Sequence, residues 1–201
     1  MSETACGRPH HCAPPDISAY EPVDAAPTDC DEDLHDLWLK DARVLDVELD
    51  RPELLDVRIE DCDISAVSMT GFIARRLHLR DSRVRGVTLI KGQCDDGLFE
   101  GCTTSDLSFR FSRLRRVVFR DCDLSAADFY NATFDHVTID RCDLQRARFD
   151  AAIVNCLAIT NSTLTAISGV SGLRGAQLDA SDLPNLAQSL ASDAGILIRD
   201  A

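Results

Sequence analysis

Cysteine, histidine and aspartate are the residues of this chain whose types and spacing could support chemistry. Four cysteines and two serines recur at one position of a 20-residue spacing: Cys62, Ser82, Cys102, Cys122, Cys142 and Ser162. Cysteine thiolates bind soft metals and react with oxidants. No Cys-x-x-Cys pair occurs in the sequence, so a structural zinc site is unsupported. Because cysteine is also small and apolar, we interpret the series as packing residues.

A second group of metal-type ligands lies near the N-terminus and comprises Cys6, His10, His11 and Cys12. Their spacing fits no structural zinc pattern, so the sequence predicts neither a metal site nor a cofactor. Nine cysteines in a small secreted protein would suggest disulfides. This chain of 201 residues shows no export signal, and we therefore expect reduced thiols and a cytoplasmic location.

The many aspartates could supply carboxylate pairs for acid–base catalysis. Asp41, Asp61, Asp81 and Asp121 instead share one position of the 20-residue spacing, and we expect them to accept hydrogen bonds from turn amides. The sequence contains no Ser-His-Asp arrangement and no glycine-rich phosphate loop. We therefore predict no catalytic residues and no enzyme activity.

The elements that would position these residues follow a period of five. Of the 26 positions reached in steps of five from Leu39 to Leu164, 23 are Leu, Ile, Val, Met or Phe. A second series, two residues earlier, is mostly small or β-branched, and the other three series are mostly polar. Helices repeat every 3.6 residues and strands every two, so neither keeps a period of five on one face. The period predicts short extended pieces joined by regular corners.

Four such units make a longer period of 20 residues. Ile59–Ile64, Leu79–Val84, Phe119–Leu124 and Ile139–Leu144 align without gaps. The sequence thus predicts an all-β coil with four sides, one pentapeptide to a side, in which each turn pairs with the next at about 4.8 Å. One outward series, Lys40, Glu60, Arg80, Glu100, Arg120 and Asp140, alternates in charge from turn to turn, as expected of stacked neighbours.

This pattern resembles the pentapeptide-repeat family, whose unit is a small residue, Asp or Asn, Leu or Phe, and two polar residues. The matches include Cys122-Asp123-Leu124, Ala127-Asp128-Phe129 and Cys142-Asp143-Leu144, and the resemblance covers roughly residues 34–183. It implies a right-handed quadrilateral β-helix. Pro52, Phe72 and Leu107 depart from the small position, and we expect the sides that carry them to be distorted.

Inward residues that stack from turn to turn should form core ladders, each buried side chain contributing about 1.5–3 kcal/mol before entropy. The predicted ladder residues are Ile59, Leu79, Phe99, Phe109, Phe119, Phe129, Phe134, Ile139, Leu144 and Phe149.

Both ends of the coil require caps, since an open coil exposes unpaired backbone groups. Residues 1–33 have the composition of a disordered, acidic, proline-containing tail. We assign residues 34–183 to the β-helix and residues 184–201 to a capping helix and a short strand at 196–198. Leu183, Leu186 and Leu190 have helical spacing, Asp182 could cap that helix, and Gly195 could end it. Resemblance to the family also implies dimerisation through this end.

Charge is distributed unevenly along the chain, whose net charge is −13. Residues 29–63 carry −10, residues 75–120 carry +6, and residues 121–201 carry −6. The acidic balance argues against direct binding of nucleic acid, and no apolar run is long enough to span a membrane. We predict a protein-interaction scaffold with an unidentified protein partner. The alternative implied by the family is a DNA mimic that binds DNA gyrase or topoisomerase IV, type II topoisomerases, and protects them from inhibitors. The mimic predicts one continuous negative stripe.

Overall fold

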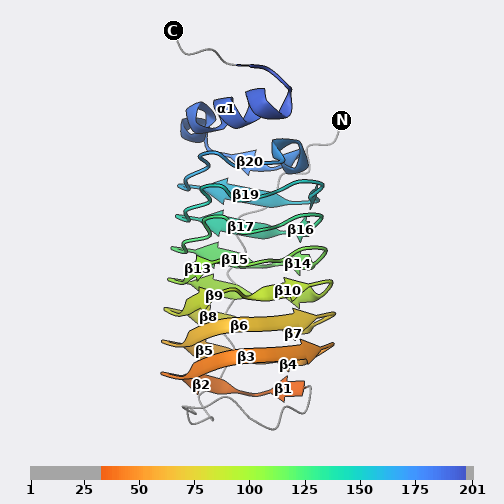
Figure 1. Ribbon diagram of the computed structural model, residues 1–201, viewed down its shortest axis with the longest axis vertical. Coiled ribbons are helices and arrows are strands. Elements are labelled where there is room, and N and C mark those ends of the chain that lie inside the picture. Colours follow the sequence, from red (N-terminus) through yellow and green to blue (C-terminus); the bar gives the residue numbers. More distant parts are fainter. Residues whose placement is uncertain (1–32, 198–201) are drawn as a thin grey trace.

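The structure is a computed structural model that describes residues 33–197. The predicted tail up to residue 32 and the Cys6–Cys12 group lie outside the described residues. Figure 1 shows the described chain as a single rod of stacked turns that rises from the first strands to a C-terminal helix. The rod is a right-handed β-helix with four sides, as predicted.

Regular corners set the period of five. Every fifth residue from Asp36 to Ala166, except Cys156, has a positive φ near the left-handed region. Asp, Asn and Gly occupy more than half of these corners, and these are the residues that tolerate this conformation at least cost. The series containing Asp41 and Asp61 therefore supplies left-handed corners, which explains its composition better than amide capping does.

The strands form three parallel sheets. The seven-stranded sheet contains β1 (Asp33–His35), β4 (Glu53–Leu55), β7 (Ile73–Arg75), β11 (Gln93–Asp95), β14 (Arg113–Arg115), β16 (Thr133–Asp135) and β18 (Ile153–Val154). The eight-stranded sheet contains β2 (Trp38–Lys40), β5 (Arg58–Glu60), β8 (His78–Arg80), β12 (Leu98–Glu100), β15 (Val118–Arg120), β17 (Val137–Asp140), β19 (Leu157–Thr160) and β20 (Gln177–Leu178). The third sheet contains β3 (Arg43–Asp50), β6 (Asp63–Thr70), β9 (Arg83–Arg85), β10 (Thr88–Ile90) and β13 (Thr103–Ser105).

The third sheet covers the two remaining sides of the coil, because β3 and β6 each run through a corner. Above it, isolated parallel bridges continue both sides at the same spacing, for example between Asp123 and Asp143 and between Asp128 and Arg148. Residues 20 apart pair throughout the strands up to β19, as in Phe99 with Phe119. The predicted 20-residue register is thus confirmed.

Stacked phenylalanines fill the C-terminal part of the core. Phe99 stacks on Phe119 with ring centroids 4.8 Å apart, and Phe129 stacks on Phe149 at 5.3 Å. The two series come from opposite sides and meet edge-on, with Phe109 and Phe119 at 5.9 Å and 73°. All of the predicted ladder residues are buried except Ile59, which is partly buried against the same core.

Phe72 occupies the small position of its unit without distorting the side that carries it. Its ring is buried, and β7 keeps its register with both β4 and β11. Two neighbours make room for the ring. Gly92 lies one turn later in the same series, and Ala74 replaces the large residue expected of that unit. The expected distortion is therefore wrong here, because a local exchange of side-chain sizes preserves the total volume.

The C-terminal cap comprises η1 (Val170–Leu173), η2 (Ala180–Asp182) and α1 (Leu183–Asp193). Asp182 precedes α1 but makes no side-chain capping bond, contrary to expectation. Gly195, with a φ of 72°, follows the helix as predicted. The strand predicted at 196–198 is wrong for Ile196 and Leu197, which lie in no strand; residue 198 lies outside the described residues. No helix within residues 33–197 is long and apolar enough to cross a membrane.

Candidate interaction surfaces

One left-handed corner carries a bulky aromatic residue. Phe111 has a φ of 58° and remains 43% exposed. A left-handed conformation costs a residue other than glycine roughly 1–2 kcal/mol, and bulky side chains rarely adopt it. Phe111 therefore combines an unfavourable backbone conformation with an exposed apolar side chain. Packing of the core requires neither feature.

Phe111 belongs to a cluster with Arg110, Tyr130 and Arg148, which we call the aromatic–arginine cluster. The Phe111 and Tyr130 rings meet edge-on with centroids 5.4 Å apart. The guanidinium groups of Arg110 and Arg148 each lie 4.9 Å from the centroid of the Tyr130 ring. The rings and guanidinium groups hold one another by cation–π contacts.

Two carboxylates fix the arginines of this cluster. Arg110 lies 3.3 Å from Asp128, and Arg148 lies 2.9 Å from Asp150. Asp128 also accepts a hydrogen bond of 2.9 Å from the backbone amide of Tyr130. The cluster is thus ordered before any partner arrives, which lowers the entropic cost of binding.

Asp128 shows where amide capping does occur in this fold. Its equivalents Asp123 and Asp143 accept hydrogen bonds of 2.9 Å from the amides of Ser125 and Gln145. These aspartates directly precede the inward ladder residue, whereas the column containing Asp41, which was expected to cap turns, occupies the corners. The expected role was correct for aspartate but was assigned to the wrong column.

Ion pairs between turns cover the seven-stranded sheet. Arg115 binds Asp95 through two hydrogen bonds of 2.9 and 2.8 Å, and Arg116 binds Asp96 at 2.6 and 2.7 Å. The hydrogen bond from Arg116 lowers the pKa of Asp96 below its ordinary value. On the eight-stranded sheet, the predicted alternation is in register, and Arg120 lies 3.4 Å from Glu100.

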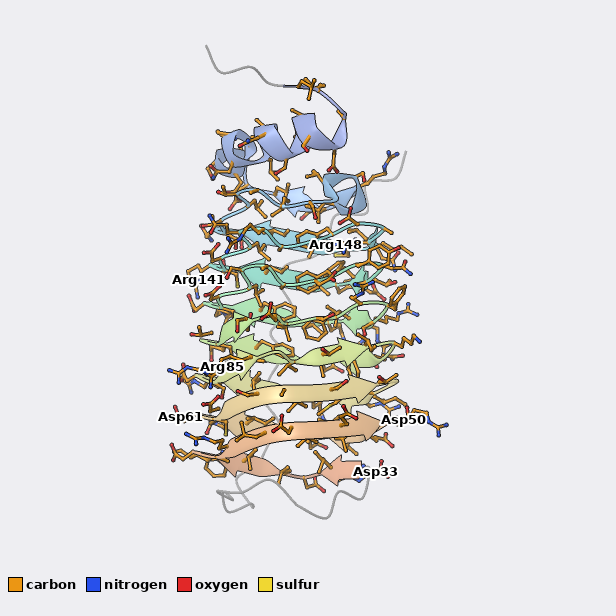
Figure 2. The ribbon with its side chains drawn as sticks, in the orientation of Figure 1. Asp33, Asp50, Asp61, Arg85, Arg141 and Arg148 are labelled. Carbon is orange, nitrogen blue, oxygen red and sulfur yellow. The ribbon has the colours of Figure 1, made fainter. Side chains whose placement is uncertain are left out.

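A positive belt surrounds the rod above its acidic first turns. Figure 2 shows Asp33, Asp50 and Asp61 in those turns and Arg85 in the turn that follows. Exposed cations lie on three sides of this turn, and Lys91 lies at the corner that ends the fourth; the members of the belt are Arg75, Arg76, Arg80, Arg83, Arg85 and Lys91. The belt interrupts negative charge along the three sides that carry these residues.

The cysteine series faces the core. Cys62, Cys102, Cys122 and Cys142 are buried free thiols, and Cys94 is buried as well. Burial raises the pKa of the Cys62 thiol, which disfavours the reactive thiolate. The prediction of reduced thiols agrees with this arrangement for Cys62, Cys102, Cys122 and Cys142. It is wrong for Cys156, which is disulfide-bonded.

Asp33, His35 and Glu53 place three ligand-type atoms within 4.8 Å of one another at the first turn. Sequence reasoning did not anticipate this group, because Glu53 is 20 residues from Asp33. Glu53 already pairs with Arg75 at 3.2 Å, and Asp33 accepts a hydrogen bond from the Glu53 amide at 3.3 Å. The carboxylates of Asp33 and Glu53 therefore already have partners within the protein.

The leucines proposed for the C-terminal end have different environments. Leu186 is 1% exposed and belongs to the core cluster, so it covers the end of the coil. Leu183 and Leu190 are 55% and 47% exposed. Ile196 and Leu197 add further exposed apolar surface beyond α1.

Comparison with known proteins locates a repeat region within the chain. Residues 93–168 match the family model described as the pentapeptide repeat region. No curated protein matches the chain. Among solved structures, the chain is similar to QnrB1, described as a plasmid-mediated fluoroquinolone resistance protein, in two trypsin-treated variants and in full length.

The first trypsin-treated variant shares 15% identity, with 78% of this chain and 99% of that chain covered and a TM-score of 0.38. The second shares 17%, with 79% and 100% covered and a TM-score of 0.26. The full-length form shares 14%, with 79% and 98% covered and a TM-score of 0.23. Since these TM-scores are below 0.5, the fold assignment rests on the coils themselves. Residues 93–168 are thus similar to a pentapeptide repeat region, and the turns on both sides continue the same register.

Proposed function

We propose that this protein is a non-catalytic scaffold that binds a protein partner through the aromatic–arginine cluster. The observation that carries the proposal is Phe111, an exposed aromatic side chain at a corner where its backbone conformation is unfavourable. Strained residues of this kind concentrate at functional sites. Tyr and Arg are enriched among the residues that dominate binding energies, and a rigid coil presents them with little loss of entropy.

The cavities of the protein support a role without catalysis. Cavities of about 70 and 90 Å³ lie inside the coil and are lined almost entirely by apolar side chains. The second occupies the N-terminal turns and contacts Leu34, Leu37 and Leu39. Neither cavity brings together an acid, a base and a nucleophile.

Replacing Phe111 with asparagine separates binding from stability. Asparagine tolerates the left-handed corner, so relief of about 1–2 kcal/mol should offset the lost ring contact with Tyr130, worth about 0.5–1.5 kcal/mol. We expect Phe111→Asn to melt at or above the wild-type temperature and to lose partner binding. A clear fall in melting temperature would indicate that Phe111 serves the fold.

Binding itself can be measured with a photo-crosslinking phenylalanine analogue at position 111. The matched control places the analogue at Ala151, an exposed left-handed corner in the same column. We expect the analogue at position 111 to crosslink predominantly to one protein. Added wild-type protein should compete well against formation of this adduct, whereas added Phe111→Asn protein should compete poorly. Equal labelling from both positions would contradict the proposal.

The DNA mimic is the second candidate, and the net charge of −13 favours it. The positive belt counts against it, because the belt interrupts negative charge along the three sides that carry its residues. A supercoiling assay with purified gyrase, with and without a fluoroquinolone, distinguishes the two candidates. Inhibition or protection at micromolar protein would support the mimic and displace the scaffold proposal.

We also propose that the exposed residues beyond the coil, Leu183, Leu190, Ile196 and Leu197, form a homodimer contact. Burying this apolar surface against a second copy would remove it from water. Analytical ultracentrifugation should show a wild-type dimer that Leu190→Glu converts to a monomer. Leu45→Glu, at a half-exposed leucine on the side of the coil, should remain dimeric. A monomeric wild type would exclude the contact.

A further inference from the structure

The two ends of the coil differ within the described chain. At the N-terminal end, β3 pairs with β6 and with no other strand of residues 33–197. At the C-terminal end, η1, η2 and α1 follow the last turn, and Leu186 of α1 is buried against the core. Figure 1 shows β3 close to one end of the rod and α1 at the other. A cap of described residues therefore covers only the C-terminal end.

Core side chains of the first turn are less well covered than those of the next turn. Val44 and Val47 are only partly buried, whereas Ile64 and Val67, one turn later in the same columns, are 8% and 3% exposed. All four side chains line the cavity of about 90 Å³ at this end. Apolar surface of the first turn is thus available to a further layer.

The backbone of β3 has unpaired hydrogen-bonding groups on its outer side. Arg43 shows this by comparison with Asp63, which occupies the same position one turn later. The Asp63 amide donates to the carbonyl of Ala42, in the preceding turn, at 3.0 Å. Since the coil repeats its geometry every 20 residues, the Arg43 amide points in the same direction, where no strand of residues 33–197 lies.

Glu48 presents both of its backbone groups in this way. Ser108, three turns later in the same column, donates its amide to the Val87 carbonyl at 2.9 Å and accepts from the Leu89 amide at 2.8 Å. Both partners belong to the turn before Ser108, so the amide and the carbonyl of Glu48 point out of the end of the coil. Unpaired groups of this kind are a template for a further strand. We call the outer side of β3 the open edge.

Carboxylates dominate the side chains beside the open edge. Asp46, Glu48 and Asp50 are exposed, and Arg43 is the only cation in β3. Within residues 33–197, neither Asp46 nor Glu48 forms an ion pair, while Asp50 lies 3.4 Å from Arg51. Like charges on neighbouring strands destabilise their pairing, so the edge repels a second copy of itself. The same carboxylates attract a basic segment.

We propose that the open edge binds an extended, basic segment of a partner protein, which adds a strand to β3. Backbone hydrogen bonds to Arg43 and Glu48 hold the segment. Its apolar side chains cover Val44 and Val47, and its lysines or arginines lie beside the carboxylates. The segment bends with β3, which passes through a left-handed corner at Asp46 with a φ of 53°. Glycine at the matching position of the segment fits this corner at least cost.

Titration of the isotopically labelled full-length chain with a peptide tests the proposal. The probe is Thr-Val-Lys-Gly-Val-Lys-Val-Lys, blocked at both ends, which places valines opposite the core positions of β3 and glycine opposite its corner. The matched control peptide has glutamate in place of every lysine. We expect the lysine peptide to shift the amide resonances of Arg43 and Glu48, and the glutamate peptide to bind at least about tenfold more weakly.

Glu48→Pro separates strand pairing from charge. Proline removes the outward amide but no hydrogen bond between β3 and β6, and an edge strand accepts proline at such a position. We expect this variant to fold and to bind the lysine peptide at least about tenfold more weakly. Glu48→Gln is the matched control, because it removes the charge and keeps the amide, and it should weaken binding by less than about threefold. Equal weakening by both substitutions would contradict strand addition.

Hydrogen exchange of the Arg43 and Glu48 amides in the protein alone shows whether the edge is free. We expect both to exchange close to the rate of an unstructured peptide. Slow exchange in the protein alone would mean that the edge is already occupied, and slowing that increases with protein concentration would place a second copy there. Either result would overturn the proposal.

Absence of amide shifts with millimolar lysine peptide would also overturn it, even if Glu48→Pro failed to fold. These experiments are independent of the proposed function. Phe111 lies three turns beyond Arg51, the corner that follows β3, so the open edge and the aromatic–arginine cluster are separate surfaces.

Discussion

Phe119→Asp is expected to abolish soluble, folded protein. The Phe119 ring is fully buried, stacks on Phe99 at 4.8 Å, and meets Phe109 and Phe129 edge-on. Losing a buried phenylalanine costs about 3–5 kcal/mol, and burying an unpaired carboxylate costs several more. Together these costs reach the roughly 5–15 kcal/mol by which a typical domain is stable. Soluble yield and a cooperative melting transition are the measurements.

Phe111→Asp is the matched control, since it makes the same chemical change at an exposed corner. This variant should remain soluble and melt cooperatively, because aspartate already occupies many left-handed corners of the coil. A cooperatively melting Phe119→Asp protein would contradict the stacked phenylalanine core. Failure of both variants would mean that the two sites do not differ in burial as described.

Gly92→Ala is the second substitution with a large expected effect, although it adds a single methyl group. A Cβ at Gly92 would lie 2.1–2.6 Å from three atoms of the Phe72 ring. The ring is itself buried and cannot swing into solvent. We expect a loss of about 2–3 kcal/mol in the free energy of unfolding, measured by urea denaturation.

A double-mutant cycle shows whether Phe72 causes that loss. Phe72→Ala removes the ring, so adding Gly92→Ala to it should change stability by less than about 0.5 kcal/mol. Such coupling would establish that the small size of Gly92 compensates for the large side chain of Phe72. An equal loss from Gly92→Ala in both backgrounds would refute the steric explanation.

The repeat register was predictable because it depends on side-chain type alone. Leu39, Phe99 and Phe119 recur at fixed intervals, and large apolar residues can recur every five positions only if the chain turns regularly. The alternation of Lys40, Glu60 and Arg80 added a second, independent series. Spacing of this kind is visible in the sequence because each stacked turn gives equivalent residues the same structural environment.

Features that depend on compensation between turns were not predicted. The departure of Phe72 was visible, but its accommodation involves Ala74 in the same unit and Gly92 one turn later, which are 18 residues apart in the sequence. Asp41 and Phe111 share the left-handed corner conformation. This conformation is likewise a property of the backbone.

The candidate sites were less predictable than the fold. Phe111 could have been noticed because, with Phe72, it is one of two phenylalanines outside the core series. Its contact with Tyr130 arises one turn away, and the contact of Tyr130 with Arg148 arises one turn further, so neither has a local signature.

Nuclear Overhauser contacts in the isotopically labelled protein test the coil most directly. The structure predicts contacts between backbone protons of residues 20 apart along the whole eight-stranded sheet up to β19, for example from Phe99 to Phe119 and from Phe119 to Ile139. Contacts dominated by residues three or four apart, or pairing at any interval other than 20 in these strands, would contradict the four-sided coil.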